Sequence, residues 1–512
     1  MGTNMRQALN RLKSSVKLGF IWRLLIVIGI ILRLRQYFVN RSLWADEASL
    51  ALNLVGRTFS GLTQPLDYGQ GAPIVFLFIE KFFIVLLGNK DYIMRLFPLF
   101  SGILAIYLIY RISREYIGTA GILAVLMFAV SWQLVYYSSE LKQYSSDVMI
   151  ALLLVYLSNR CIGTDVKARD FILLGVVGSI GIWTSHTAAF ILAGIGLVIA
   201  FEKLARREYR FLLWSLGLGL LWLAVFGLEY FVSLRYLIAD PYLQGYWQKA
   251  FMPIPHRSNL GWFVTTYFSF LTISFNRTDL ILAYIFPVLI LIGGVSLFFK
   301  SRNRALIIIL PFLMASLASL LQKYPLKGRF MLFLVPLALL LIAEGMGRIY
   351  LFLAKLNRSF SLFACGFILL LAFGAPLILT LQNFIEPYRG EDIKPVMQYV
   401  QENRSPNDIV YVFHSSGPAF TYYAPFYGLD AGRIIVGIEI PRKKLALQQF
   451  FDDVGLLKGN SRVWFVFSAI VDCGGCTGDM QTFYVEYLNT LGKQLNSFNG
   501  SGANAYLYDL NP

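Results

Sequence analysis

The stretch "GAPIVFLFIEKFFIVLLG", residues 71–88, decides how this chain is threaded through a membrane. It has the length and apolar character of a membrane-spanning helix, but Glu80 and Lys81 lie at its centre. Each charge would cost about 2.5–3.5 kcal/mol at the middle of a bilayer. We therefore predict that 71–88 is a juxtamembrane helix lying along the outer face and not a span.

The composition of the whole chain indicates a polytopic membrane protein. Of its 512 residues 57% are hydrophobic and only 14% are charged, whereas soluble domains average about 25% charged residues. The net charge is +16, and the basic residues form short clusters between apolar runs. That pattern is typical of cytoplasmic loops and argues against a nucleic-acid partner.

About eleven apolar runs remain as predicted spans once 71–88 is set aside. They are 17–36, 95–112, 119–138, 146–162, 171–185, 187–202, 211–232, 279–299, 305–321, 330–346 and 359–381. With this count the basic loops 110–118, 164–170, 202–210 and 300–304 all fall on the side of the basic N-terminus. The positive-inside rule assigns that side to the cytoplasm.

The same topology predicts which segments lie outside. These are a large first loop at 37–94, the segments 136–147, 184–189, 233–278 and 322–329, and everything after residue 382. We expect a plasma or inner membrane location with the C-terminal part periplasmic or extracellular.

Two domains are predicted, a transmembrane domain at 1–381 and an α/β domain at 382–512. Strand-like runs at 408–413, 433–438, 463–469 and 505–510 alternate with helical patterns at 393–403 and 479–495. Strands that alternate with helices are typical of a small α/β domain. Cys473 and Cys476 form "CGGC", which fits a disulfide in an oxidising compartment or a simple turn. Cys161 and Cys365 stand alone in apolar runs and are expected to be inert.

Adjacent carboxylates in the first outer loop form the first candidate site. The stretch "NRSLWADEASLALN" (40–53) places Asp46 and Glu47 directly before an apolar helical pattern. Acidic residues stabilise the N-terminus of a helix, and locally that interpretation is favoured. The alternative is a catalytic pair.

The stretch "SSELKQYSSD" (138–147) is the second candidate. A helix starting near Ser138 or Ser139 would place Glu140, Tyr144 and Asp147 on one stripe. A capped helix entry explains the pattern equally well, but Asp147 would then lie inside a span, where an ionisable group indicates function.

Cations on the outer side form the third candidate. Lys323, Lys327 and Arg329, and Arg33, Arg35 and Arg41 near the first loop, run against the positive-inside bias. A phosphate group at the membrane surface explains them, and anionic lipid headgroups are the alternative. His186 falls at an outer turn, where a lone histidine is more often structural. His256 and His414 have no metal-site spacing.

These pieces together resemble the GT-C glycosyltransferases that use polyprenyl-phosphate sugars. The branch in question contains the protein O-mannosyltransferases (glycosyltransferase family 39) and the lipid A aminoarabinose transferases. The similarity lies in "LWADEASLALNL" (43–54), "GQGAPIVFLFIEKFFIVLLGNKDYIMRLFPLFSGILAIYLIYRI" (69–112), "YYSSELKQYSSD" (136–147) and "YPLKGRFMLFLVP" (324–336). Where relatives often have a tyrosine after the arginine, this chain has Phe330.

The resemblance implies an inverting transfer of one sugar from a polyprenyl-phosphate donor to a hydroxyl of a lipid, glycan or protein. Asp46 is expected to be the general base, with Glu47 and Glu140 in support. The donor phosphate is expected to bind Arg329, Lys327, Lys142 and Arg41. Tyr144, Asp147, His186 and Tyr324 are expected to position the donor or acceptor. No cofactor is expected to be obligatory, although a divalent metal is possible.

Other functions remain open at this point. An oligosaccharide ligase or a phosphoethanolamine-type transferase is the nearest enzymatic alternative. A transporter or flippase of lipid-linked sugars would show paired halves and broken helices, whereas this sequence has no internal repeat and gathers its charges at one face. A non-catalytic scaffold is the third alternative.

Overall fold

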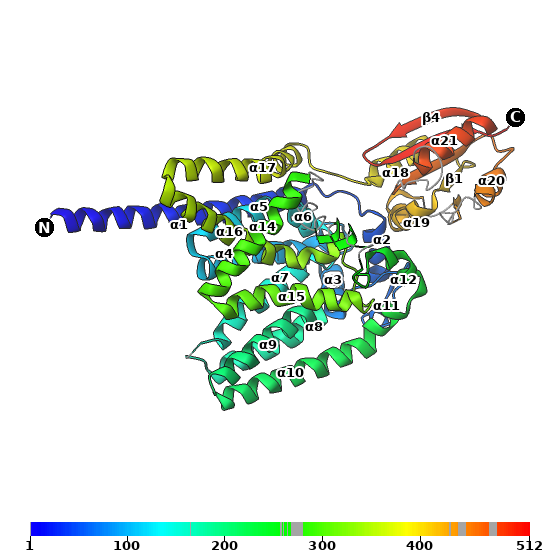
Figure 1. Ribbon diagram of the computed structural model, residues 1–512. Helices are drawn as coiled ribbons and strands as arrows, with labels where there is room; N and C mark the ends of the chain where they lie inside the picture. The colour runs from blue at the N-terminus through cyan, green and yellow to red at the C-terminus, as the bar shows by residue number, and fades with distance from the viewer. Residues whose placement is uncertain are drawn as a thin grey trace.

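The computed structural model describes residues 2–163, 165–256, 259, 261–263, 265–267, 280–429, 432–438, 447–469 and 479–511. Within these residues a helical bundle occupies one end of the molecule and a domain with a β-sheet occupies the other (Figure 1). Cys473 and Cys476 lie outside the described residues, whereas Cys161 and Cys365 are buried and unpaired.

All eleven apolar runs predicted as spans are helical. They correspond to α1 (Gly2–Phe38), α4 (Leu96–Tyr116), α5 (Gly121–Val130) with α6 (Trp132–Tyr136), α7 (Tyr144–Ser158), α8 (Ala168–Thr184), α9 (Ala188–Ala205), α10 (Tyr209–Glu229), α14 (Leu280–Lys300), α15 (Arg302–Leu320), α16 (Val335–Leu356) and α17 (Arg358–Ile385). The apolar pattern therefore predicts the helices of the bundle correctly.

Fewer of these helices meet a strict standard for crossing a membrane. Five in the described residues are long and apolar enough, and up to seven if two bent pairs are each one span. One bent pair is Gly118–Val130 with Trp132–Ser139, which bends by 58°. The helix α7, with 15 residues, is shorter than the roughly 20 residues that a bilayer needs.

Close helix packing at two glycines joins α14 to α16. A Cβ atom at Gly293 would lie 1.9 Å from the carbonyl oxygen of Leu341, and one at Gly345 would lie 2.2 Å from that of Leu289. Small residues allow backbones in membranes to approach in this way. The two helices are therefore in backbone contact.

The stretch 71–88 forms the short helix α3 (Ile74–Leu87). Its 14 residues span only about 21 Å at 1.5 Å per residue, less than the hydrocarbon thickness. The ammonium of Lys81 donates to the carbonyl oxygen of Leu54 at 2.7 Å, at the end of α2 (Ala45–Gly56). Lys81 thus joins the two helices of the first outer loop.

The prediction of one helix from residue 138 or 139 onward is wrong. Residues Tyr137–Ser139 form a single 3₁₀ turn, Glu140 has an extended backbone, and α7 begins at Tyr144. The extended conformation lets the backbone N–H of Leu141 reach the Glu47 carboxylate at 2.7 Å. A buried tertiary hydrogen bond therefore breaks the helical stripe.

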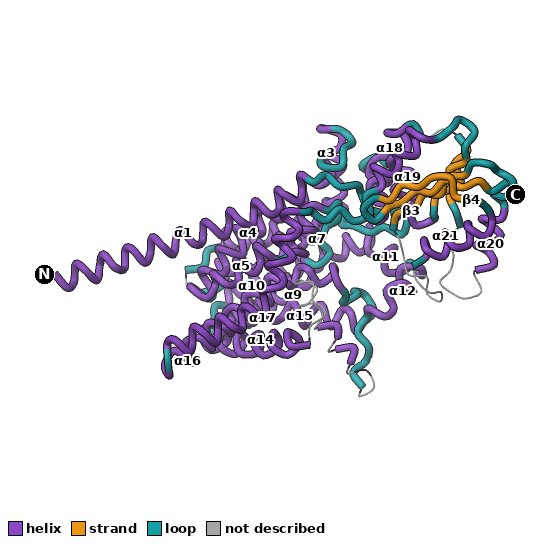
Figure 2. Tube along the Cα trace, turned by 90° about the horizontal axis from the view of Figure 1, so that it is seen from above, coloured by secondary structure: helices purple, strands orange, loops and turns teal. Residues whose placement is uncertain are grey.

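The C-terminal domain has the predicted α/β character. Its five-stranded sheet has the order β2-β1-β3-β5-β4, shown in orange in Figure 2. The strands are β1 (Ile409–Val412), β2 (Arg433–Val436), β3 (Val463–Ser468), β4 (Lys493–Asn499) and β5 (Ala503–Asp509). β1 is parallel to β2 and to β3, while β5 is antiparallel to β3 and to β4.

Helices surround this sheet. They are α18 (Ile393–Asn403), α19 (Gly417–Tyr423), α20 (Leu447–Gly455) and α21 (Met480–Leu491). The sequence missed β4, because "KQLNSFN" is polar and is interrupted by a bulge between Gln494 and Asn496. Edge strands are commonly of this kind, since one side of the ladder is unpaired.

Candidate active site

The helix α2 carries both adjacent carboxylates in its first turn. Trp44 precedes the helix but provides no side-chain cap, and Asp46 and Glu47 follow it. Negative charge at this end complements the helix dipole. The helix-start interpretation is thus correct locally, but it does not explain where the two side chains point.

The Asp46 carboxylate is held between two cations. Its Oδ1 atom accepts hydrogen bonds from Nζ of Lys142 and Nε2 of Gln70, both at 3.0 Å. Its Oδ2 atom lies 2.8 Å from Nη2 of Arg329. Three segments far apart in sequence therefore converge on one carboxylate, whose side chain keeps 19% of its surface exposed.

The same contacts set the protonation state of Asp46. Burial raises the pKa of a carboxyl group, but Lys142 and Arg329 overcome this and hold the pKa of Asp46 well below its usual range. Burial in turn lowers the pKa of Lys142. Asp46 is therefore ionised at neutral pH.

Glu47 is the buried centre of a second charge cluster. Oε2 lies 2.7 Å from Nη1 of Arg41 and 2.7 Å from Nη2 of Arg95. Oε1 accepts from Nε of Arg95 at 2.9 Å and from the Leu141 N–H at 2.7 Å. Both oxygens of this fully buried side chain are engaged, so Glu47 fastens α2 to its neighbours.

Arg41 belongs to this buried cluster. Its guanidinium also lies 4.7 Å from the centre of the Tyr136 ring and 3.9 Å from the Glu140 carboxylate. Only 2% of the side chain is exposed. Arg41 thus contacts protein carboxylates at the position where the sequence suggested a phosphate ligand.

Glu140 is fully buried, and its two carboxylate oxygens accept no hydrogen bond from the described residues. Burial and the nearby charge of Glu47 raise its pKa to about 7, against the opposing effect of Arg41 and Arg329. A buried carboxyl group that titrates near neutral pH beside another carboxylate is typical of functional sites.

Arg329 packs against two aromatic rings. It lies in a 3₁₀ segment (Gly328–Leu334) that leads into α16, and its guanidinium carbon lies 5.3 Å from the Trp44 ring and 5.4 Å from the Tyr144 ring. These rings orient the guanidinium toward Asp46. Lys327 precedes the segment, is exposed, and forms no side-chain hydrogen bond or ion pair within the described residues.

Asp147, His186 and Tyr324 lie around a second polar cluster. Nε2 of His186 lies 2.9 Å from Oε1 of Glu229, and Asp147 interacts with both Ser185 and His186. The Tyr324 hydroxyl donates to the carbonyl oxygen of Phe330 at 2.7 Å.

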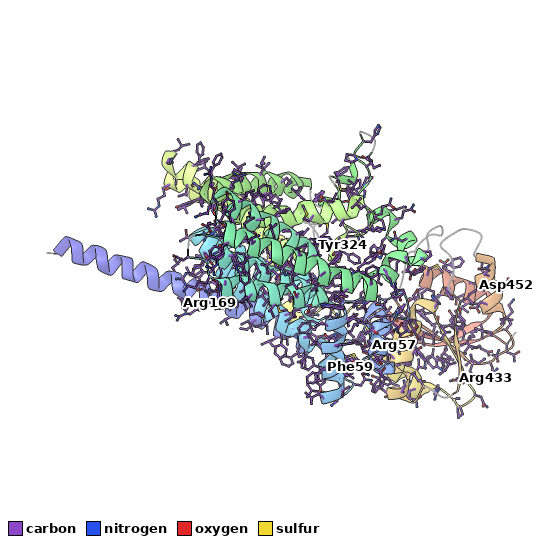
Figure 3. All side chains as sticks on the ribbon, turned by 90° about the horizontal axis from the view of Figure 1, so that it is seen from below. Arg57, Phe59, Arg169, Tyr324, Arg433 and Asp452 are labelled. Atoms are coloured by element: carbon purple, nitrogen blue, oxygen red, sulfur yellow. The ribbon has the colours of Figure 1, made fainter. Side chains whose placement is uncertain are left out.

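Figure 3 labels Tyr324 toward the end of the bundle that faces the C-terminal domain, whereas Arg169 lies toward the other end. Phe330 follows Arg329 directly in the chain. The Tyr324–Phe330 hydrogen bond therefore connects this second polar cluster to the neighbourhood of Asp46.

The C-terminal domain holds the segment directly before Asp46. Oε2 of Glu391 accepts the Ala45 N–H at 3.2 Å. The Asp392 carboxylate accepts both the N–H and the hydroxyl of Ser42, and the Tyr423 hydroxyl accepts the Leu43 N–H at 2.8 Å. The tail domain thus supplies the cap that Trp44 cannot provide.

The structure brings most of the predicted site residues together. Asp46, Lys142 and Arg329 are in direct contact, Tyr144 packs on Arg329, and Glu47, Glu140 and Arg41 form the adjacent cluster. The sequence interpretation missed Gln70, Arg95, Glu229 and Glu391. Gln70 and Arg95 lie inside the stretch 69–112 that carried the resemblance, whereas no local pattern marks Glu391.

The described residues contain no group of three or more His, Cys, Asp or Glu side chains that could hold a metal ion.

Part of the chain matches a known protein family. Residues 71–253 match the family described as dolichyl-phosphate-mannose-protein mannosyltransferase. The matched region contains Arg95, Glu140, Lys142 and His186. None of the curated proteins matches the sequence.

The fold is similar to that of two solved glycosyltransferases. ArnT from Cupriavidus metallidurans bound to undecaprenyl phosphate aligns with a TM-score of 0.53 and 15% identity, over 94% of this chain and 97% of ArnT. The chain has the fold of the GT-C membrane glycosyltransferases, and its residues 71–253 match a glycosyltransferase family.

The second structure is the archaeal oligosaccharyltransferase AglB from Archaeoglobus fulgidus, in complex with an inhibitory peptide and a dolichol-phosphate. It aligns with a TM-score of 0.50 and 12% identity, over 95% of this chain and 74% of AglB. At these identities the two structures establish the GT-C fold, and the enzyme class rests on the family match together with that fold.

Proposed function

We propose that this GT-C glycosyltransferase transfers one sugar from a polyprenyl-phosphate donor to an acceptor hydroxyl, with inversion at the anomeric carbon. The observation that carries this proposal is a partly exposed carboxylate, Asp46, placed directly against two cations, Lys142 and Arg329. The solved ArnT and AglB structures contain undecaprenyl phosphate and dolichol-phosphate, respectively.

The reaction needs one base and one stabiliser of negative charge. The acceptor oxygen attacks the anomeric carbon while the bond from that carbon to the phosphate oxygen breaks, and its electron pair leaves with the phosphate. Asp46 takes the proton of the attacking hydroxyl. Arg329 and Lys142 neutralise the charge that develops on the departing polyprenyl phosphate.

The contacts of Asp46 couple donor binding to base strength. While Arg329 and Lys142 contact Asp46, its low pKa makes it a weak base. A donor phosphate competes for the same two cations and draws positive charge away from the carboxylate. Asp46 then becomes more basic when the donor is in place, so the base is activated in the complex.

The neighbouring charges position this base. Glu47 fixes α2 through Arg41 and Arg95, and Glu391 caps the same helix one residue before Asp46. Ionised Glu140 adds negative charge beside Asp46 and raises its affinity for a proton. Glu47 and Glu391 are therefore positioning residues, because their carboxylates are engaged in holding α2 and are not proposed to touch the acceptor.

The sugar is proposed to lie between Asp46 and the cluster of Asp147, His186 and Glu229. Oδ1 of the buried Asp147 has no hydrogen-bond partner within the described residues. Carboxylate oxygens accept the hydrogen bonds that sugar hydroxyls donate. Lys327, exposed beside Arg329, is placed to meet the outer part of the phosphate group.

The substitution Asp46→Asn tests the base assignment. Transfer from a panel of undecaprenyl-phosphate monosaccharides is expected to fall at least 100-fold, because general-base catalysis contributes about 10²–10⁴-fold. Binding of undecaprenyl phosphate is expected to be unchanged or tighter, since a competing anion is removed. Donor affinity and turnover are measured on the same detergent-purified enzyme.

A matched control is Asp67→Asn, which alters an exposed aspartate of the same loop that pairs with Arg57 at 2.7 Å. This variant is expected to keep wild-type turnover. Wild-type turnover in Asp46→Asn itself would contradict the role of Asp46 as base.

The acceptor is proposed to be a hydroxyl of a lipid, glycan or protein, with the active site and the C-terminal domain on the periplasmic or extracellular side. A transporter is not favoured, because the fold is that of transferases and the family match is to a mannosyltransferase. An oligosaccharide ligase differs from this proposal in the size of the transferred group, which the donor panel distinguishes.

A further inference from the structure

A groove on the surface of the bundle is separate from the active site. It lies along α14 and α16 and has a volume of about 450 Å³. Its lining consists of Leu291, Ile292, Val295, Ser296, Phe299 and Arg348. Five of these side chains come from α14, and Arg348 alone from α16.

The groove lies far along the bundle from Asp46. The helix α16 begins at Val335, six residues after Arg329, and Arg348 lies 13 residues further on. At 1.5 Å per residue this places Arg348 roughly 20 Å along the helix from its start. The groove therefore opens toward the other leaflet of the membrane, away from the proposed donor phosphate.

One buried carboxylate faces two cations at the polar end of the groove. Nζ of Lys300 lies 2.5 Å from Oε1 of Glu344, and Nε of Arg348 lies 3.2 Å from the same atom. Ser296 also contacts both Glu344 and Arg348. Glu344 is almost fully buried, whereas about 40% of each cationic side chain is exposed. The cluster thus carries a net charge of +1 at a surface.

The guanidinium of Arg348 has unused hydrogen-bonding capacity. Its Nε atom is engaged by Ser296 and Glu344, but within the described residues no partner contacts Nη1 or Nη2. These two nitrogens are the ones that make paired hydrogen bonds to a phosphate. Both nitrogens are therefore available to a phosphate group.

The rest of the groove is apolar and open. Leu291 is 67% exposed and Phe299 is 84% exposed, which in a membrane means contact with lipid chains. An apolar groove that ends at Arg348, with Lys300 paired to the same carboxylate as Arg348, matches a phospholipid with an anionic headgroup. Basic pockets between transmembrane helices bind such headgroups in other membrane proteins.

We propose that this groove binds one anionic phospholipid, with its phosphate against Arg348 and Lys300 and an acyl chain along Leu291, Val295 and Phe299. The net positive charge selects against a zwitterionic lipid, whose ammonium group would face two cations. The site is independent of the transfer reaction, because no residue of the Asp46 cluster takes part in it.

The experiment uses the full chain, purified in detergent and titrated with phosphatidylglycerol or phosphatidylcholine in native mass spectrometry. The wild type is expected to bind one phosphatidylglycerol at least tenfold more tightly than phosphatidylcholine. Arg348→Gln is expected to weaken phosphatidylglycerol binding about tenfold while the melting temperature reports whether the variant folds. Val295→Trp fills the groove without changing any charge and is expected to weaken binding similarly.

The matched control is Arg358→Gln, which removes the same charge from an exposed residue at the start of α17 that does not line the groove. This control is expected to bind phosphatidylglycerol like the wild type. Equal binding of both lipids, or equal losses in Arg348→Gln and Arg358→Gln, would overturn the proposal in favour of non-specific attraction of anionic lipid.

Discussion

Asp46 and Glu47 differ by one methylene group and one position in the chain, but their surroundings give them different chemistry. Glu47 is enclosed by Arg41, Arg95 and a backbone N–H, and nothing is exposed. Asp46 keeps 19% of its side chain exposed, and its oxygens contact Lys142 and Arg329. Glu47 therefore fixes the structure, whereas Asp46 is available to a substrate.

Arg329→Ala is expected to weaken the binding of undecaprenyl phosphate about 10- to 100-fold. The reason is that a charge-assisted hydrogen bond between arginine and phosphate contributes roughly 1.5–3 kcal/mol. Affinity is measured by titration of the purified enzyme. Arg57→Ala, which removes an arginine from an exposed ion pair in the same outer loop, serves as the control, and unchanged donor affinity in Arg329→Ala would rule out the phosphate clamp.

The pH dependence of turnover is expected to follow Glu140 and not Asp46. In the free enzyme the pKa of Asp46 lies well below its usual range, so Asp46 is expected to stay ionised near pH 7 even after the donor has made it more basic. Burial and Glu47 raise the pKa of Glu140 to about 7. Turnover should therefore rise as pH increases through about 7, because ionised Glu140 makes Asp46 more basic.

The variant Glu140→Gln is expected to lose this rise near pH 7. Turnover of this variant should then decrease only below about pH 6, as Glu391 becomes protonated. Burial raises the pKa of Glu391 to about 6, although its hydrogen bond to Ala45 and the nearby Arg41 oppose this shift. The measurement is turnover against pH at saturating donor. A Glu140→Gln profile identical to that of the wild type would show that Glu140 does not titrate in the reaction.

At the scale of elements, contacts between segments decide which helices pack together and where a helix begins, and the helical pattern of the sequence shows neither. The sequence predicts α14 and α16 as apolar helices, but it does not reveal that Gly293 and Gly345 bring their backbones together. It predicts α18 at its observed bounds, Ile393–Asn403. The sequence pattern starts the helix that contains Tyr144 five or six residues too early. The reason is the hydrogen bond from Leu141 to Glu47, a tertiary contact that keeps the chain extended before the helix.

Gly345→Ala is expected to lower the melting temperature by several degrees. Its methyl group would lie 2.2 Å from the Leu289 carbonyl oxygen, so the helices must separate, and overpacking of this kind costs about 1–3 kcal/mol. Gly366→Ala in α17 meets no atom within 4 Å and is expected to be neutral or stabilising. Unfolding is followed by tryptophan fluorescence in detergent, and equal melting temperatures for both variants would contradict the close packing.

At the scale of the molecule, the C-terminal domain contacts the segment that leads to Asp46. The side chains of Glu391, Asp392 and Tyr423 accept hydrogen bonds from three of the four residues before Asp46, namely Ser42, Leu43 and Ala45. Lys394 adds an ion pair to Asp91 at 2.9 Å, and Tyr423 donates to the same carboxylate. The tail domain therefore fixes the entry into α2, although its sequence carries little of the family resemblance.

A reporter fused after Pro512 tests the orientation of the whole chain. Because the tail domain contacts the segment around Asp46, both must lie on the same side of the membrane. The fusion is expected to be active in a reporter that works only outside the cytoplasm and inactive in one that works only inside. A cytoplasmic signal from the fusion would reverse the proposed side of the active site.

The sequence by itself determined the membrane class, the positions of the eleven apolar helices and the α/β character of the tail. These follow from local pattern, because burial in lipid and helix periodicity act on neighbouring residues. The candidate residues Asp46, Glu140, Lys142 and Arg329 came instead from the predicted topology and the family resemblance, since the local pattern at Asp46 favoured a helix start. Only the tertiary structure decided which of two adjacent carboxylates is accessible and that Glu391 reaches α2. Those outcomes depend on contacts between residues separated by up to 346 positions, and such contacts leave no periodic trace in one sequence.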